Sequence, residues 1–189
     1  MKLLIIAPSR TGGRTLNYWL SLELNHLYVH EPFHFHKESF IKTKDELMKT
    51  LYNENIVVKV NFGDWRSTFE DKFFFSLFDK IICLTRNNIY DAALSYTKAL
   101  QTKNFTKGYL LKEEWIENNS EEIKINYEYL KTQMLMTKEL QNTLQLTYEG
   151  IYETQEELEL IKNYLSISNF EHLNLINKNM RYRNQIKLI

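Results

Sequence analysis

Two adjacent glycines with arginines on both sides follow the first apolar run of the sequence, Lys2–Ala7. This segment, 8–15, leads directly into an apolar helical pattern. Backbone amides at a helix N-terminus are unpaired and carry partial positive charge, and glycines let the chain approach an anion closely. The arginines and threonines of the same turn add charged and hydroxyl donors. We therefore expect a phosphate-binding loop, with contacts from Arg10, Thr11, Gly12, Gly13, Arg14 and Thr15.

This loop differs from the Walker pattern G-x-x-x-x-G-K-[ST] of ATP and GTP hydrolases. Pro8 stands in place of the first glycine and Arg14 in place of the lysine. The predicted strands also do not end in an acidic residue suited to holding Mg²⁺. Such a hydrolase is therefore disfavoured. A P-loop kinase or other phosphotransferase, with Arg14 as its phosphate-binding cation, stays an alternative.

A second pair of anion-binding candidates lies farther along the chain. Arg86 directly follows the apolar run Lys80–Thr85, and Ser95 comes nine positions later within a helical pattern. A guanidinium fork and a hydroxyl presented from one helix end are suited to binding a dianion. The pair predicts a second phosphate site.

Together these motifs resemble those of the sulfotransferases that use 3′-phosphoadenosine 5′-phosphosulfate (PAPS). In that family a loop of approximate form Pro-[Arg/Lys]-[Ser/Thr]-Gly-[Ser/Thr]-[Ser/Thr] holds the 5′-phosphosulfate, and an Arg and a Ser hold the 3′-phosphate. The resemblance assigns the first role to segment 10–15 and the second to Arg86 and Ser95. Gly13 and Arg14 depart from the small hydroxyl residues usual in the loop. The spacing from Arg to Ser is similar to that of bacterial trehalose-type sulfotransferases.

Two shorter elements extend the resemblance over roughly residues 2–152. Segment 30–33 is similar to the Glu-Pro-[Leu/Phe] element of carbohydrate sulfotransferases, and Tyr148 begins a stretch similar to the family's Tyr-Glu-[Asp]-Leu element. The chain lacks the Arg-Lys-Gly-x-x-Gly element of cytosolic sulfotransferases, for which Arg181 and Arg183 are candidate replacements in binding the nucleotide.

The resemblance implies an enzyme that moves a sulfuryl group from PAPS to a hydroxyl and releases adenosine 3′,5′-bisphosphate (PAP). The acceptor is a small alcohol, a carbohydrate or a peptide side chain. The alternatives are the P-loop kinase and a non-catalytic module that binds 3′-phosphoadenosine nucleotides. Because ATP carries no 3′-phosphate, Arg86 and Ser95 argue against the kinase.

Sulfuryl transfer to a hydroxyl requires a base for the acceptor proton and stabilisation of the charge on the leaving nucleotide. Glu31 is the preferred base, because it lies in the loop after the second predicted strand, beside Pro32. His30 is the alternative, because a histidine titrates near neutral pH without perturbation. Lys59 lies in the apolar run Ile56–Asn61, where a lysine is rarely buried unless paired. It approaches the sulfonate or the acceptor, unless the strand lies at an edge and Lys59 points to water.

Aromatic residues and histidines near Glu31 invite two further interpretations. The candidates for lining an acceptor pocket are Trp65, Phe33 and Phe35. A metal site would draw on His30, His34 and His36 together with Glu31. Alternating positions in a short loop do not enforce metal geometry, and no second ligand cluster accompanies them. We therefore expect no metal.

Short apolar runs alternate with helical patterns, which is typical of strands joined by crossover helices. The expected strands are Lys2–Ala7, Leu27–His30, Ile56–Asn61, Lys80–Thr85 and Leu144–Tyr148. The expected helices cover Thr15–Leu24, Ile89–Gln101 and most of Ser120–Gln141, with capping boxes starting others at Thr43 with Glu46, Ser67 with Glu70 and Thr154 with Glu157. We predict a three-layer α/β/α fold around a mainly parallel sheet of about five strands. In such a sheet ligands bind beyond the carboxyl ends of the strands.

Composition excludes several other classes of protein. The 24 basic residues balance 24 acidic ones, so the positive field of a nucleic-acid-binding protein is lacking. The single cysteine, Cys83, lies in an apolar run and is expected to be a buried thiol. Apolar runs are too short for a signal peptide or a membrane span, so we expect a cytoplasmic protein. We expect one domain over residues 1–189, with a tail, 166–189, of weak periodicity.

Overall fold

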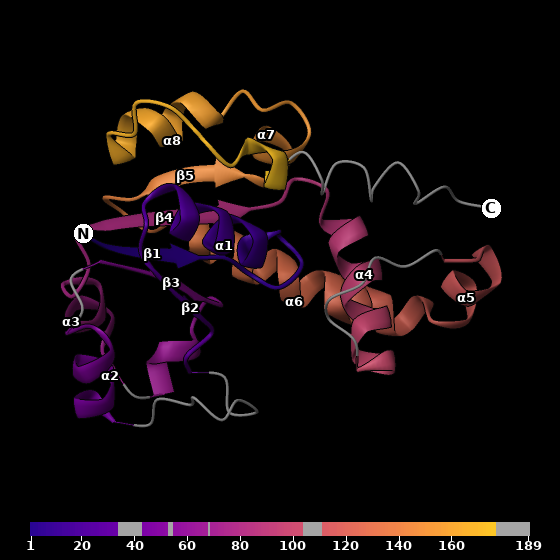
Figure 1. Ribbon diagram of the computed structural model, residues 1–189. Helices are drawn as coiled ribbons and strands as arrows, with labels where there is room; N and C mark the ends of the chain where they lie inside the picture. The colour runs from indigo at the N-terminus through magenta and orange to yellow at the C-terminus, as the bar shows by residue number, and fades with distance from the viewer. Residues whose placement is uncertain (34–42, 53–54, 68, 104–110, 177–189) are drawn as a thin grey trace.

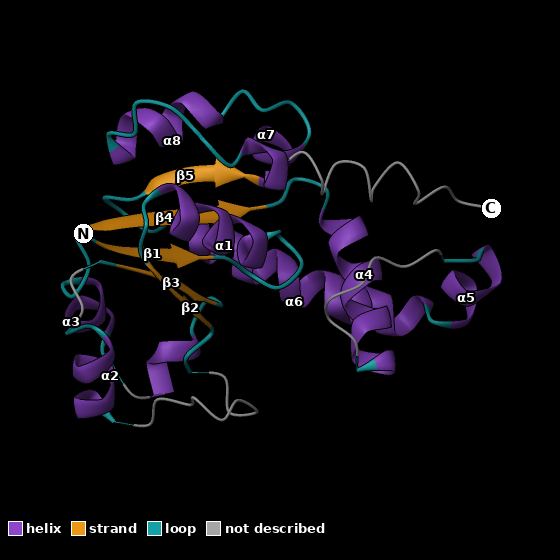
Figure 2. Ribbon diagram, in the orientation of Figure 1, coloured by secondary structure: helices purple, strands orange, loops and turns teal. Residues whose placement is uncertain are grey.

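The computed structural model describes residues 1–33, 43–52, 55–67, 69–103 and 111–176. These residues form a central sheet of five parallel strands in the order β2-β3-β1-β4-β5 (Figures 1 and 2). The strands are β1 (Lys2–Ile6), β2 (Leu27–His30), β3 (Ile56–Val60), β4 (Lys80–Thr85) and β5 (Leu144–Thr147). The predicted strands are confirmed, with bounds that differ by at most one residue.

The sheet is covered on both faces by helices. Side chains alternate along each strand, so Leu3 and Ile5 of β1 join one apolar cluster while Leu4 and Ile6 join another. The helices packed on the first face are α1 (Gly13–Glu23), α7 (Tyr148–Tyr152) and α8 (Leu158–Leu165). The second face carries the 3₁₀ helix η1 (Asp64–Ser67), α3 (Asp71–Phe75) and α6 (Ser120–Lys138), the last of which lies behind the sheet in Figure 1. The predicted three-layer α/β/α fold is confirmed.

A helical arm extends from the carboxyl-terminal end of the sheet (Figure 1). It consists of α4 (Ile89–Thr102), α5 (Glu113–Asn118) and the first turns of α6. The arm has its own apolar cluster, formed by Ala92, Ala93, Leu94, Leu111, Ile123, Leu130 and Met134. Within it, the buried amide of Asn126 donates a hydrogen bond of 2.9 Å to the hydroxyl of Thr97. Packing against α6 thus fixes the position of α4, which follows β4 in the chain.

The strand order places a crevice between β1 and β4. After β1 the chain moves to β2 and β3 on one side, and after β4 it moves to β5 on the other. In open parallel sheets the ligand crevice lies at such a reversal of direction, beyond the carboxyl ends of the strands. The loop that follows β1 and the residues that follow β4 therefore face one another, and these segments carry Arg10 and Arg86.

The predicted capping box before α2 (Lys44–Thr50) is confirmed. The Thr43 hydroxyl accepts a hydrogen bond of 3.2 Å from the Glu46 amide, and the Glu46 carboxylate accepts one of 3.1 Å from the Thr43 amide. These two bonds satisfy donors that a helix N-terminus leaves unpaired.

The other two capping boxes were predicted wrongly. Helix α3 begins at Asp71 with Glu70 as its N-cap, and Ser67 ends η1. Helix α8 begins at Leu158, and the carboxylate of Glu157 is bound elsewhere. It accepts hydrogen bonds from the amide and hydroxyl of Thr147, at 2.6 and 3.0 Å. Glu157 therefore bonds to a residue at the end of β5 and does not cap the first turn of a helix.

The first part of the tail packs on the α1 face of the sheet. Partly buried Ile167, Phe170, Leu173 and Leu175 join its apolar cluster, and Ile176 is fully buried. Sequence periodicity did not indicate this, because Ile167 and Phe170 lie in an irregular stretch and only residues 173–176 of the segment form a helical turn.

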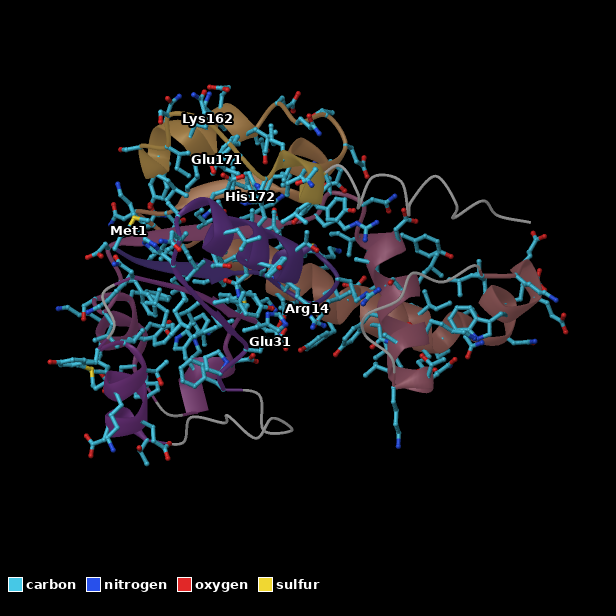
Figure 3. All side chains as sticks on the ribbon, viewed as in Figure 1. Met1, Arg14, Glu31, Lys162, Glu171 and His172 are labelled. Atoms are coloured by element: carbon cyan, nitrogen blue, oxygen red, sulfur yellow. The ribbon has the colours of Figure 1, made fainter. Side chains whose placement is uncertain are left out.

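Glu23, at the end of α1, fixes this segment by hydrogen bonds. Its side chain is only 1% exposed. The carboxylate accepts from the indole of Trp19 at 2.8 Å and from the backbone amides of Glu171 and His172 at 2.9 and 2.6 Å. Glu171 and His172 lie over α1 in Figure 3. Glu23 therefore ties the tail to the core.

The structure also describes the environment of the single cysteine and the length and polarity of the helices. Cys83 is fully buried, and burial raises the pKa of its thiol to about 11, so the thiol stays protonated near neutral pH. In the ranges that the structure describes, none of the helices combines the length and apolar character needed to cross a bilayer.

We predict that Glu23→Ala lowers the free energy of unfolding by about 2–4 kcal/mol, because three donors lose a charged, buried acceptor. The measurement is chemical denaturation followed by circular dichroism. Glu117→Ala, which removes an exposed carboxylate from α5, should change the stability by less than about 0.5 kcal/mol. Equal stabilities for the two variants would contradict the role assigned to Glu23.

Candidate functional site

The predicted phosphate loop connects β1 to α1 in an unusual backbone conformation. Arg10 and Gly12 both have positive φ angles, of 65° and 82°. Thr11 is fully buried, and its hydroxyl donates a hydrogen bond of 2.7 Å to the carbonyl of Pro8, so this side chain braces the loop itself. The amide of Thr15 donates to the carbonyl of Gly12 at 3.0 Å and begins the helix. The first amides of a helix have no partner within the helix, so those of α1 are available to an anion.

Both glycines are required by close packing. A Cβ atom at Gly12 would lie 2.6 Å from the ring of Tyr152 and 3.0 Å from that of Tyr148. Tyr152 also donates a hydrogen bond of 2.8 Å from its hydroxyl to the Gly12 carbonyl. A Cβ atom at Gly13 would collide with Ala7. The two tyrosines of α7 thus hold the loop from one side.

Arg86 is buried at the end of β4, where several groups hold its guanidinium. Its Nη1 donates to the carbonyl of Arg10 at 3.3 Å, and its guanidinium lies over the ring of Tyr148, 5.0 Å from the centroid. The carboxylates of Asp91 and Glu149 lie 3.5 and 3.9 Å from its nitrogens. The guanidinium fork is thus held in one orientation, which suits it to bind an oxyanion, while the two carboxylates offset part of its positive charge.

Ser95 and Arg10 meet across the crevice, although 85 positions separate them in the sequence. The Nε of Arg10 donates a hydrogen bond of 2.8 Å to the Ser95 hydroxyl. The sequence had suggested two separate phosphate sites, one containing Arg10 and the other containing Arg86 and Ser95. The structure brings all three residues together beside the N-terminus of α1, because Arg86 also bonds to the backbone of Arg10.

Arg14 is exposed on the first turn of α1 and is directed toward the second strand. It hydrogen-bonds to the hydroxyl of Tyr28, and this bond opposes the rise in the pKa of Tyr28 that burial causes. Arg14 and Glu31 lie at the same end of the sheet in Figure 3. The role of Arg14 toward a phosphate is a prediction.

A second group of polar side chains lies beside the loop and centres on Lys59. Strand β3 is flanked by β2 and β1, and Lys59 is 3% exposed, so the interpretation of β3 as an edge strand is wrong. Its Nζ lies 2.6 Å from Glu31 Oε1 and 2.6 Å from Asn61 Oδ1. Burial lowers the pKa of Lys59 below its ordinary value, and the charge of Glu31 acts in the opposite direction.

The two candidate bases lie next to each other. Nε2 of His30 is 3.6 Å from Oε1 of Glu31. Glu31 has a φ of 50°, in the left-handed region, which is costly for a residue other than glycine and is often found at functional sites. This conformation turns the carboxylate toward Lys59.

Lys59 also connects this group to the phosphate loop. A Cβ atom at Gly13 would lie 3.1 Å from Cε of Lys59, so the lysine side chain passes directly beside the first turn of α1. The Lys59 group and the predicted phosphate loop therefore lie next to each other.

Other predicted site residues lie elsewhere. Trp65 and Phe33 are buried in the apolar cluster of the second face, so they cannot line an open acceptor pocket. Phe35, His34, His36, Arg181 and Arg183 lie outside the described residues. In the part of the chain that the structure describes, histidine, cysteine and carboxylate side chains form no cluster that could hold a metal ion.

Sequence reasoning missed Asn61 and Asp64, which continue the Lys59 group, and Glu149, which binds the backbone after β4. Glu149 accepts hydrogen bonds from the amides of Asn87 and Asn88 at 2.9 and 3.1 Å. Asn61 immediately follows β3 and is thus at the carboxyl edge where ligands bind in such sheets. That rule could have found it, had the strand not been extended over it.

Comparison of the sequence with known protein families gives no match, and comparison with curated proteins also gives none. Solved structures of similar fold include a sulfotransferase from Alicyclobacillus acidocaldarius, at 15% identity and a TM-score of 0.49, over 87% of this chain and 81% of that one. They also include mouse sulfotransferase SULT7A1 complexed with PAP, at 14% identity and a TM-score of 0.50. That match covers 95% of this chain and 63% of the mouse protein, so this chain spans less than two thirds of its length. This protein has a sulfotransferase fold.

We predict that Gly12→Ala destabilises the protein by at least about 2 kcal/mol more than Gly63→Ala does. Both glycines have a positive φ, 82° and 86°, but a Cβ at Gly63 meets nothing within 4 Å. The two variants share the conformational cost, and only Gly12→Ala adds the collision with Tyr152 and Tyr148. Thermal and urea unfolding measure the difference. If both variants lost the same stability, the packing of α7 on the loop would be irrelevant.

Proposed function

We propose that this protein is a sulfotransferase that moves a sulfuryl group from PAPS to a hydroxyl of an acceptor. One observation carries the proposal: Arg10, Ser95 and Arg86 converge beside the N-terminus of α1, where buried Lys59, paired with Glu31, passes next to Gly13. An extended basic site suits a nucleotide with phosphate groups at both its 5′ and 3′ positions. The adjoining carboxylate suits removal of a proton from a hydroxyl.

The residues divide into two groups with separate roles. Arg10 and the amides of Gly13 and Arg14 bind the 5′-phosphosulfate and stabilise the negative charge that builds on the leaving phosphate. Arg86 and Ser95 bind the 3′-phosphate. Tyr148 supports Arg86 from below its guanidinium plane.

Glu31 acts as the base. In the transfer, the acceptor oxygen forms a bond to sulfur while the bond between sulfur and the bridging phosphate oxygen breaks, and PAP leaves with that electron pair. The acceptor proton passes to the carboxylate of Glu31, and Lys59 provides the positive charge between the two reacting groups. His30, 3.6 Å from Glu31, is the alternative base. The acceptor is a small alcohol, a carbohydrate or a peptide side chain.

A kinase and a nucleotide-sensing module would each use only part of this site. A kinase that uses ATP and Mg²⁺ would give Arg86 and Ser95 no ligand group to bind. A module that only senses 3′-phosphoadenosine nucleotides would leave the Lys59–Glu31 pair without a role, although it would bind PAP equally well.

We predict that PAP raises the melting temperature of the protein and that Arg86→Ala weakens PAP binding by about 1.5–3 kcal/mol, or roughly 10- to 150-fold in Kd. The measurements are thermal shift and isothermal titration calorimetry on folded variants. Lys131→Ala, which removes a cation from the outer side of α6, should leave Kd unchanged. Stabilisation by ATP–Mg²⁺ but not by PAP would favour the kinase.

We also predict that Glu31→Gln keeps its affinity for PAPS but lowers the rate of sulfuryl transfer by about 10²–10⁴-fold, the usual contribution of a positioned base. The assay is transfer of [³⁵S]sulfate from PAPS to a panel of hydroxylated acceptors, with nucleotide affinity measured on the same preparations. A nearly full rate for Glu31→Gln would move the role of base to His30. A wild-type protein that binds PAP yet transfers to none of the acceptors would favour the sensing module.

A further inference from the structure

Asp64 extends the Lys59 group by one more carboxylate. It is the first residue of η1, and its Oδ2 accepts hydrogen bonds from both the backbone amide and the side-chain amide of Asn61, at 3.3 and 3.1 Å. Asn61 Oδ1 in turn accepts the bond of 2.6 Å from Lys59. The side chains thus form a chain of bonds in the order Glu31, Lys59, Asn61, Asp64.

The charges at its two ends determine which way the Asn61 amide points. An ammonium group can only donate hydrogen bonds, and an ionised carboxylate can only accept them. The amide of Asn61 therefore presents its oxygen to Lys59 and its NH₂ group to Asp64. If the amide were reversed, it would place donor against donor at Lys59 and acceptor against acceptor at Asp64. Bonds linked in this way also polarise and strengthen one another.

The electrostatic surroundings of Asp64 come from both the sheet and the helical arm. Burial raises the pKa of Asp64, while the charge of Lys59 and the bonds from Asn61 oppose that rise and Glu31 adds to it. In the arm, burial raises the pKa of the phenols of Tyr96 in α4 and Tyr129 in α6, and the negative charge of Asp64 adds to the rise in both.

We propose that Asp64 is a positioning residue of the transfer site, which holds the Lys59 ammonium in place through the Asn61 amide. This inference rests on the proposed function. When Glu31 takes the acceptor proton it becomes neutral, and Lys59 loses its adjacent counter-charge. A buried, uncompensated ammonium is costly. Asp64 supplies a negative charge that persists at that stage, so Lys59 stays protonated and stays in position.

The test is the titration of Lys59 in Asp64→Asn. This change keeps the size of the side chain but removes its charge and its acceptor-only character. The probe is NMR of lysine labelled with ¹³C at Cε, with the Lys59 signal assigned by its loss in Lys59→Arg. The titration midpoint of Lys59 should fall by about half a pH unit or more. Transfer should lose roughly tenfold in kcat, while KM for PAPS changes less than about twofold.

Asp71→Asn is the matched control. Asp71 also belongs to the segment after β3, but its carboxylate accepts from Trp65 and Arg66, at 2.7 and 3.0 Å. Its loss should lower stability and leave the Lys59 midpoint unchanged.

A second test replaces the bridging amide. Asn61→Ser should lower the titration midpoint of Lys59, as Asp64→Asn does. The double variant Asn61→Ser/Asp64→Asn should then shift it by less than the sum of the two single changes.

The two hypotheses fail in different ways. An unshifted Lys59 midpoint in folded Asp64→Asn and Asn61→Ser would overturn the role of Asp64, whatever the transfer rates. A midpoint that falls equally in Asp71→Asn would also overturn it, because the effect would then be a general loss of structure. Failure of the wild-type protein to transfer sulfate counts against the proposed function alone, since the Lys59 titration needs no activity.

Discussion

The burial of one lysine determines how the candidate site is built. Lys59 belongs to a strand with neighbours on both sides, and its ammonium is almost completely removed from water. A charge in that place is stable only with close acceptors, which Glu31 and Asn61 provide at 2.6 Å each. The backbone after β2 adopts a left-handed conformation at Glu31, where the carboxylate meets Lys59. The need to compensate this single cation thus arranges two loops at the carboxyl edge of the sheet.

The packing of α7 brings the predicted anion-binding groups together at the same edge of the sheet. Tyr148 and Tyr152 of α7 press on Gly12, and Tyr148 also underlies Arg86. Glu149 of the same short helix binds the backbone amides that follow β4. One five-residue helix therefore fixes both the loop after β1 and the start of α4. Lys59 also passes beside Gly13, so the Lys59–Glu31 pair and the loop after β1 lie next to each other.

Local sequence patterns predicted the strands well, but they did not predict which side chains bond to one another. The five strands were predicted to within one residue. The inner strands β1, β3 and β4 are short, mostly apolar runs, as burial on both faces of a parallel sheet requires, whereas the edge strands β2 and β5 are more polar and more exposed. The pattern of Thr154 with Glu157 failed for the opposite reason. A carboxylate binds whichever donors the fold brings nearest, and for Glu157 these are the amide and hydroxyl of Thr147, at the end of β5.

The sequence by itself determined the α/β class and the positions of the predicted phosphate loop after β1 and of the candidate base after β2, since each depends on residues that are close together in the chain. Only the tertiary structure decided that Arg10 bonds to Ser95, 85 positions away, and that Lys59 bonds to Glu31, 28 positions away. It also decided that β3 is an inner strand, which buries Lys59 and makes Asn61 and Asp64 part of the site. Strand order sets these contacts, and strand order follows from the packing of the whole sheet, which no short stretch of sequence encodes.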